Sequence, residues 1–202
     1  INIPLSDKWA LRAFAFTRED DGFMTNPGSL SPVFGVDYNQ PEDVGAYEQS
    51  GGRLVLHGEV NDRISITASA RFNEYDGPVN NWARDMGAAG SLQYPLTLDT
   101  SLNPTHERET FGARFEINVE GDVFDFKSIT SYTDTESDRH TDIDLTQLWF
   151  INTFRPETME VMTQEFRFSS SSEGPLQWVG GVYLMDLEET MNSYFDLGWI
   201  AI

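Results

Sequence analysis

Residues 53–75 read RLVLHGEVNDRISITASARFNEY, two alternating arms joined at Asn61-Asp62. On the second arm, the apolar residues Ile64, Ile66, Ala68, Ala70 and Phe72 alternate with the polar residues Arg63, Ser65, Thr67, Ser69, Arg71 and Asn73. Alternation with a period of two is typical of a β-strand with one apolar face, and a short polar turn between two such arms is typical of a hairpin. The stretch therefore predicts a β-hairpin. The fold depends on what covers its apolar face, which is either a second sheet or lipid.

Seven segments along the chain have strand character, and no amphipathic helix or internal repeat interrupts them. They are residues 8–17, 53–60, 63–75, 110–119, 123–133, 159–169 and 176–185. Several are about ten residues long, which exceeds the usual strand of about 5–6 residues and matches the roughly 9–11 residues that cross a bilayer at a tilt. In the segment 123–133 the apolar positions change sides near Lys127-Ser128, which predicts a β-bulge there.

The connections between these segments alternate between long and short. Long, polar connections are predicted at about 18–52, 76–109 and 134–158, and short turns at about 4–7, 61–62, 120–122 and 170–175. Outer-membrane barrels place short turns at the periplasmic end and long loops at the extracellular end, whereas a soluble sandwich mixes them. The pattern favours an all-β, antiparallel up-and-down transmembrane β-barrel over a sandwich, with the long loops extracellular and the short turns periplasmic.

Composition excludes several classes of function. Thirteen Lys and Arg against thirty-three Asp and Glu give a net charge of −20, which argues against nucleic-acid binding because phosphate contacts need a basic surface. There is no cysteine, so thiolate chemistry and disulfides are absent. His57, His106 and His140 lie far apart, and no motif of a hydrolase, P-loop or dinucleotide site occurs. The sequence predicts neither an enzyme nor a cofactor.

Four phrases of the chain resemble the barrel of TonB-dependent outer-membrane receptors. They are IPLSDKWALRAFAFTREDDGFMTN, GGRLVLHGEVNDRISITASARFNEYDG, FDFKSITSYTD and TQEFRFSSSSEGPLQWVGGVYLMDLEE, and they follow the family's order and spacing over nearly the whole chain. The resemblance implies a barrel of about 22 strands closed by a plug. It also implies a ligand bound at the extracellular face of a Gram-negative outer membrane, and energy delivered through the TonB complex.

The family's plug domain and TonB box are not found in these 202 residues. The resemblance therefore implies that residues 1–202 are a partial barrel, about seven strands of a larger one. The partners that follow are outer-membrane lipid and lipopolysaccharide, the TonB complex through a plug elsewhere in the protein, and the rest of the barrel or another chain at both sheet edges. The implied cargo is a siderophore, cobalamin or an oligosaccharide.

Candidate site residues fall into three groups. Aromatic and polar loop residues that suit ligand binding are Trp82, Arg84, Asp85, Tyr94, Trp149 and Arg155. Arginines expected to line the lumen, or to pair with plug carboxylates, are Arg53, Arg63, Arg71, Arg114 and Arg167. Alternate carboxylates that suit a hard cation are Asp134, Glu136 and Asp138, although a solvated acidic loop explains them better.

Two other interpretations stay open at this point. The chain could be a small complete barrel, porin-like or adhesive, with YFDLGWIAI as an eighth strand. It could also be a soluble sandwich that binds carbohydrate through Trp82 and Trp149.

Overall fold

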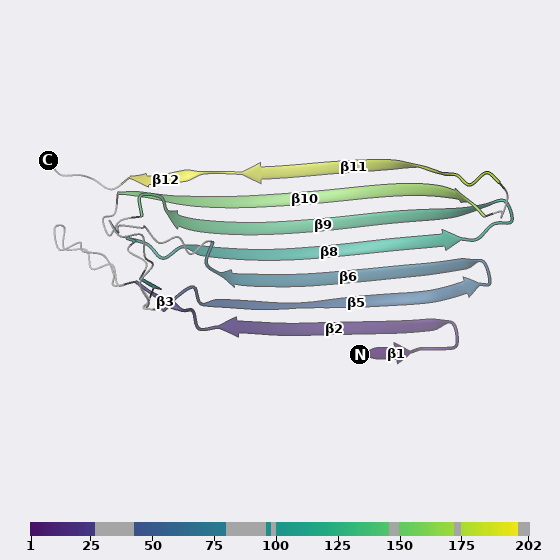
Figure 1. Cartoon of the computed structure of the whole chain (residues 1–202), viewed down its shortest axis with the longest axis horizontal. Helices are drawn as coiled ribbons and strands as arrows, with labels where there is room; N and C mark the ends of the chain where they lie inside the picture. The colour runs from purple at the N-terminus through teal and green to yellow at the C-terminus, as the bar shows by residue number, and fades with distance from the viewer. Residues whose placement is uncertain (27–42, 80–95, 98–99, 146–149, 172–174, 198–202) are drawn as a thin grey trace.

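A computed structural model describes residues 1–26, 43–79, 96–97, 100–145, 150–171 and 175–197, and its main element is one long antiparallel sheet (Figure 1). The strand order is β1-β2-β5-β6-β8-β9-β10-β11, so that long strands adjacent in the chain are adjacent in the sheet. The long strands are β2 (Trp9–Asp20), β5 (Tyr47–Asn61), β6 (Ile64–Gly77), β8 (Thr105–Val119), β9 (Phe124–Asp142), β10 (Ile151–Ser170) and β11 (Val179–Met191). The predicted all-β, up-and-down fold is confirmed.

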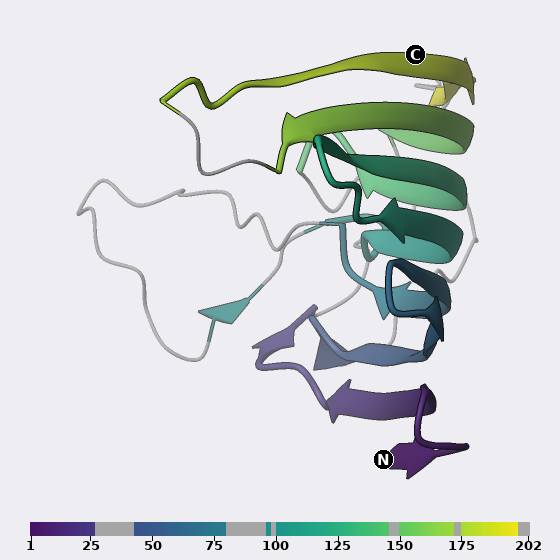
Figure 2. The same ribbon diagram turned by 90° about the vertical axis from the view of Figure 1, so that its right-hand side faces the viewer.

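Short strands complete the described structure. β1 (Asn2–Pro4) pairs with β2, and β12 (Tyr194–Leu197) pairs with β10. A small separate sheet contains β3 (Met24–Thr25), β4 (Asp43–Val44) and β7 (Leu96–Thr97), and it lies off one side of the long sheet (Figure 2). Among the described residues, no helix is long and apolar enough to cross a membrane.

The long strands extend further into the predicted loops than expected. β9 has 19 residues and β10 has 20, so the predicted loop 134–158 is mostly strand, and only 143–150 connect the two. The other long connections shorten to 21–46 and 78–104, and the short turns lie at 5–8, 62–63, 120–123 and 171–178. The ends of these strands carry polar side chains on both faces, including buried ones such as Ser137 and Thr153, and for that reason their sequence resembles a loop.

The turn between β5 and β6 shows how side chains determine where the strands end. The Asn61 side-chain oxygen accepts hydrogen bonds from the amides of Arg63 (2.9 Å) and Ile64 (3.0 Å). Such a local bond to the backbone is why Asn favours turns. The turn is therefore Asp62-Arg63, one residue later than predicted.

The predicted bulge near Lys127-Ser128 is wrong, because β9 keeps one register against both β8 and β10. The apolar pattern changes sides because Ser128 and Thr130 lie on the otherwise apolar face. Gln164 on β10 joins them: Thr130 Oγ1 donates to Gln164 Oε1 (2.6 Å), and Gln164 Nε2 donates to Ser128 Oγ (3.0 Å). The three side chains satisfy one another, so the strand stays regular.

The segment Tyr194–Leu197 is not an eighth strand. It pairs with Ile151–Phe154 of β10 in the same register by which β11 pairs with the rest of that strand. The amide of Asn192 donates to the Pro156 carbonyl (3.1 Å) and bridges the two segments. β11 and β12 are therefore one interrupted strand, contrary to the small-barrel interpretation.

The two faces of the long sheet differ in chemistry, because successive side chains of a strand point to opposite sides. We call the first the apolar face; its central band contains Leu11, Ala13, Leu54, Leu56, Ile66, Ala68, Ala70, Phe72, Phe111, Ala113, Phe115, Ile117, Phe126, Met162, Phe166 and Phe168. The side chain of Leu54 in this band is 53% exposed, and in the described part of the chain nothing packs against the band. That is unlike a sandwich, in which a second sheet covers the apolar face.

Opposite lies what we call the arginine face. Every lysine and arginine on the long strands shares it: Arg12, Arg18, Arg53, Arg71, Arg108, Arg114, Lys127, Arg139, Arg155 and Arg167. In contrast, an acidic belt occupies the apolar face between its apolar band and the loop end: Glu19, Glu48, Glu74, Asp76, Glu107, Glu109, Asp134, Glu136, Asp138, Glu160, Asp186 and Glu188.

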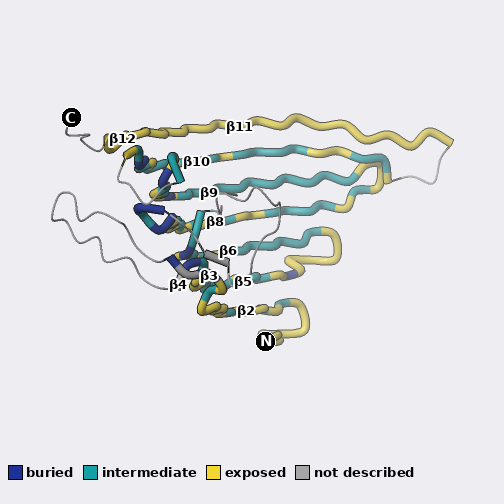
Figure 3. The backbone as a smooth tube through the Cα atoms, turned by 60° about the vertical axis from the view of Figure 1, so that its left-hand side comes forward, coloured by how far each residue is buried: buried dark blue, intermediate teal, exposed yellow. Residues whose placement is uncertain are grey.

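Burial concentrates at the loop end of the sheet, where the tube in Figure 3 turns dark blue. Among the described residues the buried apolar side chains are Met24 and Val44 in the small sheet, and the other strongly buried groups there are polar. The long sheet therefore forms a wall without a core of its own. The buried residues lie at its loop end, where they connect the long loops.

Candidate functional site

Hydrogen bonds tie the three long connections together at the loop end. The side-chain amide of Asn26 donates to the Thr100 carbonyl (3.1 Å) and to Asn103 Oδ1 (2.7 Å). The amide and hydroxyl of Ser101 both donate to Asp142 Oδ2 at 2.8 Å, and the Leu145 amide donates to Asp142 Oδ1 (2.9 Å). We call this set the loop junction. It joins segments that lie far apart in the sequence.

Asp142 is the central residue of the loop junction and is 2% exposed. It is the last residue of β9 and lies well beyond Tyr132, on the loop side of the apolar band. Burial raises the pKa of Asp142, and the hydrogen bonds from Ser101 and Leu145 only partly oppose that rise. A buried carboxyl whose charge is disfavoured makes the junction sensitive to pH.

We expect the loop junction to be more stable in acid than at neutral pH. The pKa of Asp142 in the closed junction exceeds its ordinary value of 3.8, so between these two values the closed junction binds more protons than the open one. The contribution to stability is full below 3.8 and falls as the pH rises through the folded value. Hydrogen exchange at the Ser101 and Leu145 amides, corrected for intrinsic rates, should give higher protection at about pH 4 than at about pH 7. Asp142→Asn, which does not titrate, should abolish the difference; a difference that persists in this variant would contradict the assignment.

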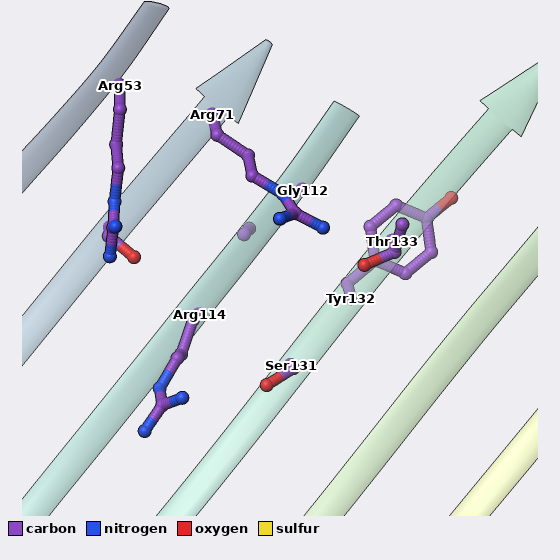
Figure 4. Close-up of a pocket in the computed structure, with 9 residues that line it drawn as sticks. Arg53, Arg71, Gly112, Arg114, Ser131, Tyr132 and Thr133 are labelled. Atoms are coloured by element: carbon purple, nitrogen blue, oxygen red, sulfur yellow. The ribbon is translucent and has the colours of Figure 1, made fainter. Parts of the chain in front are cut away.

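A second candidate site is a concavity of about 270 Å³ on the arginine face (Figure 4). Arg53, Arg71 and Arg114 project into it from β5, β6 and β8, on the same side as Ser131 and Thr133. We call it the arginine pocket. The three guanidinium groups, rather than an apolar lining, make it a candidate site for an anion.

The Arg71 side chain lies over Gly112 of the neighbouring strand β8. A Cβ on Gly112 would lie 2.7 Å from Arg71 Nε, so only a glycine leaves room for Arg71 to lie across the neighbouring strand. Arg53 and Arg71 are direct partners in the β5–β6 ladder. Two like charges directly opposite each other on adjacent strands are destabilising unless an anion lies near them.

Carboxylates of the central arginine face are already paired with other cations. Glu116 accepts from Arg114 (2.6 Å) and pairs with Lys127 (3.0 Å). Glu165 accepts from Arg167 Nε (2.9 Å). Within the described part of the chain, Arg53 and Arg71 form no hydrogen bond and no ion pair.

Nearer the loop end, the arginine face carries a cluster of rings and cations. The rings of Tyr75 and His106 meet edge-on at 5.6 Å, and the Arg108 guanidinium lies 5.9 Å from the centre of the Tyr75 ring. The Nε atoms of Arg108 and Arg139 are buried and have no hydrogen-bond partner among the described residues. Guanidinium groups that lack a hydrogen-bond partner among the described residues therefore occur both in the arginine pocket and nearer the loop end.

The loop residues predicted to bind a ligand can be placed only in part. Trp82, Arg84, Asp85, Tyr94 and Trp149 lie outside the described residues. Arg155 is on β10 rather than in a loop, exposed on the arginine face, with Arg139 as its ladder partner. Their role in ligand binding stays a prediction.

The predicted lumen arginines are brought onto one face with a single exception. Arg63 lies in the turn 62–63 rather than in the strand, and its Nη2 is 2.8 Å from Asp122 Oδ1. Arg53, Arg71 and Arg114 meet in the arginine pocket, and Arg167 lies closer to the short turns. The exposed ring of Phe14 beside Arg53 was not predicted, because its side of the strand follows only from the register.

The predicted cation ligands Asp134, Glu136 and Asp138 lie on β9, not in a loop, and belong to the acidic belt. Over the described ranges, no group of three or more His, Cys, Asp or Glu side chains is arranged to hold a metal ion. Glu107 and Glu109, the β8 ladder partners of Asp138 and Glu136, are also acidic, so the charges on the two strands repel one another.

No protein-family model matches the sequence, and no curated protein matches it. Among solved structures, the described fold is similar to the ferric yersiniabactin uptake receptor FyuA from Yersinia pestis, with a TM-score of 0.76 and 18% sequence identity. The match covers 96% of this chain and 28% of the receptor, so the chain spans little more than a quarter of that protein's length. The chain therefore has the fold of one part of this uptake receptor, an antiparallel up-and-down β-sheet.

Proposed function

We propose that this chain is part of the barrel wall of a TonB-dependent outer-membrane receptor in a Gram-negative bacterium. The observation that carries the proposal is the match of 96% of the chain to an uptake receptor despite only 18% identity. The four sequence phrases that resemble this family support it independently. A wall of this kind needs one lipid-compatible face and one polar face, and the sheet has both.

The apolar face fits a bilayer in height as well as in chemistry. The nine residues of β6 from Ile64 to Phe72 fall within the roughly 9–11 residues that a tilted strand needs to cross a bilayer. Trp9 and Phe126 lie toward the short turns and Tyr132 toward the loop end, where interfacial aromatic girdles occur. The acidic belt then stands beyond the hydrocarbon, at the level of lipopolysaccharide.

The receptor would take up a scarce and bulky nutrient: a siderophore–iron chelate, cobalamin or an oligosaccharide. The long connections at the loop end would meet it first, and the arginine face would line the lumen. A plug elsewhere in the protein, moved by the TonB complex, would release it inward. No covalent chemistry is involved, so the protein is a transporter and not an enzyme.

The edges of the sheet require further strands in this proposal. β1 and β2 form one edge, and β11 with β12 forms the other. Unpaired strand edges are not tolerated in lipid, because their backbone amides and carbonyls would lack partners. The rest of the barrel, or another chain, would pair with both.

The two rival interpretations each conflict with an observation. A small complete barrel needs a closed sheet, but Tyr194–Leu197 continues β11 and, among the described residues, neither β11 nor β12 pairs with β1 or β2. A soluble sandwich needs a cover for the apolar face, and within the described residues no second sheet packs on it.

The test is an intact mass measured under denaturing conditions, on protein extracted with detergent from outer membranes. We expect a mass several times that of these 202 residues, because the barrel and plug belong to the same protein. A mass equal to that of these residues alone would overturn the receptor assignment. Recovery of the protein without detergent would overturn the membrane location.

A further inference from the structure

The basic side chains of the strands are sorted onto one side of the sheet. In a chain of net charge −20, every lysine and arginine on the long strands shares the arginine face, while the acidic belt occupies the other. Alternation of side chains would allow either side, so the sorting makes the arginine face the polar, cationic side of the sheet, where an anion could lie.

The positive charge of Arg53 and Arg71 is not balanced by a carboxylate of the described wall. They stand directly opposite each other, yet neither pairs with a carboxylate in the described part of the chain. Glu116, the nearest wall carboxylate along β8, already accepts from Arg114, Asn118 and Lys127. The two guanidinium groups are therefore available to something that is not part of this wall.

Their surroundings suit a carboxylate. Guanidinium groups bind carboxylates through two parallel hydrogen bonds, and such charge-assisted bonds are about twice as strong as neutral ones. The hydroxyl groups of Ser69, Ser131 and Thr133 line the same concavity of about 270 Å³ and add further polar contacts.

Beside the arginines lies an exposed aromatic surface. Phe14 is the ladder partner of Arg53, and its side chain is 60% exposed. Its ring lies 5.7 Å from that of Phe16, which rests over Gly51: a Cβ there would be 2.7 Å from Phe16 Cε1. The surface offers an apolar contact next to the charge, as small-molecule sites commonly do.

We propose that Arg53 and Arg71 together bind one carboxylate group in the arginine pocket, with Phe14 against the carbon skeleton that carries it. The proposal rests on the proposed function only in that the arginine face borders a lumen. The carboxylate belongs either to a free molecule that enters the lumen or to an acidic side chain of the protein segment that fills it. The chemistry of recognition is the same in both cases.

The experiment uses the complete receptor extracted in detergent and compares its thermal unfolding midpoint with that of the double variant Arg53→Gln/Arg71→Gln. Citrate is the carboxylate probe, and sodium chloride at equal ionic strength is the reference. If the carboxylate comes from a free molecule, citrate raises the wild-type midpoint, as a ligand of the folded state must, and the double variant loses the rise. If it comes from the protein, citrate has no effect and the double variant unfolds at a lower temperature.

The proposal is overturned if citrate does not change the unfolding midpoint of the wild type and the double variant is at least as stable as the wild type. That result would mean that the two opposed like charges hold no carboxylate, because removing them then costs no stability. Arg63→Gln is the control, since Arg63 pairs with Asp122 in an exposed turn and should leave the citrate response unchanged. Arg53→Lys/Arg71→Lys keeps the charge without the forked geometry and should restore only part of the effect. Fractionation of the receptor tests the proposed function separately, so failure of the carboxylate site leaves the membrane assignment intact.

Discussion

In the proposed barrel wall, replacing Ala68 with arginine is expected to destabilise the folded protein by about 2–4 kcal/mol, the penalty for a basic side chain at the bilayer midplane on the lipid side of a barrel. Ala68 is in the middle of the apolar band, with Leu56 and Phe115 as its ladder partners. Neither partner offers a counter-charge or a hydrogen-bond acceptor. The guanidinium would have to reach an interface or draw water into the hydrocarbon.

The matched control is Thr67→Arg, one residue earlier and on the opposite face. There the new side chain would lie beside Glu116, the ladder partner of Thr67, and would lose only the 2.9 Å contact between Thr67 Oγ1 and His57 Nδ1. Urea unfolding in lipid vesicles measures both variants. Equal destabilisation would show that the two faces see the same medium, and the sheet would then not be a membrane wall.

Asp142→Ala is expected to open the loop junction while leaving the wall folded. The substitution removes the acceptor that the Ser101 amide, the Ser101 hydroxyl and the Leu145 amide share, and losing a hydrogen bond of a buried donor costs about 1–3 kcal/mol. The loss falls on the connections above the sheet, because the β9–β10 ladder does not depend on this side chain. Hydrogen exchange should therefore accelerate at Ser101 and Leu145, and remain slow at the centre of β9.

Asp138→Ala provides the comparison, because Asp138 is an exposed carboxylate on the same strand. A surface change of this kind normally alters stability by less than about 0.5 kcal/mol. If the two variants exchange alike, the junction is not held by Asp142. If Asp142→Ala also unfolds the strands, the junction and the wall form one cooperative unit.

The existence and order of the long strands could be predicted from the sequence, because alternation continues wherever one face meets an apolar medium. Their ends could not. In residues 134–142 the alternating side chains are Asp, Glu, His, Ser, Thr and Arg, which carry no apolar signal, and the ladder with β10 decides the structure. The bulge expected near Lys127-Ser128 failed for a related reason: Gln164, distant in sequence, satisfies the polar side chains that broke the pattern.

The sequence could predict which face of the sheet a site residue lies on, because side chains alternate along a strand. Arg53, Arg71 and Arg114 share a face because of their spacing, but their meeting in one pocket needs the registers of β5, β6 and β8. The loop junction could not be predicted from any local sequence pattern, because Ser101 and Asp142 are 41 residues apart. The loop residues expected to bind a ligand lie mostly beyond the described structure, so that prediction stays untested.

The sorting of charge between the two faces also has a consequence for assembly. If one strand slipped by a single residue against its neighbour, each of its side chains would move to the opposite face. In β8 of the proposed barrel wall, such a slip would turn Arg108 and Arg114 toward lipid and Phe111, Phe115 and Ile117 toward the lumen. A misregistered wall would then place charge in the hydrocarbon, which is strongly unfavourable, so the arginines that suit an anion in the finished wall would also disfavour the wrong register during assembly.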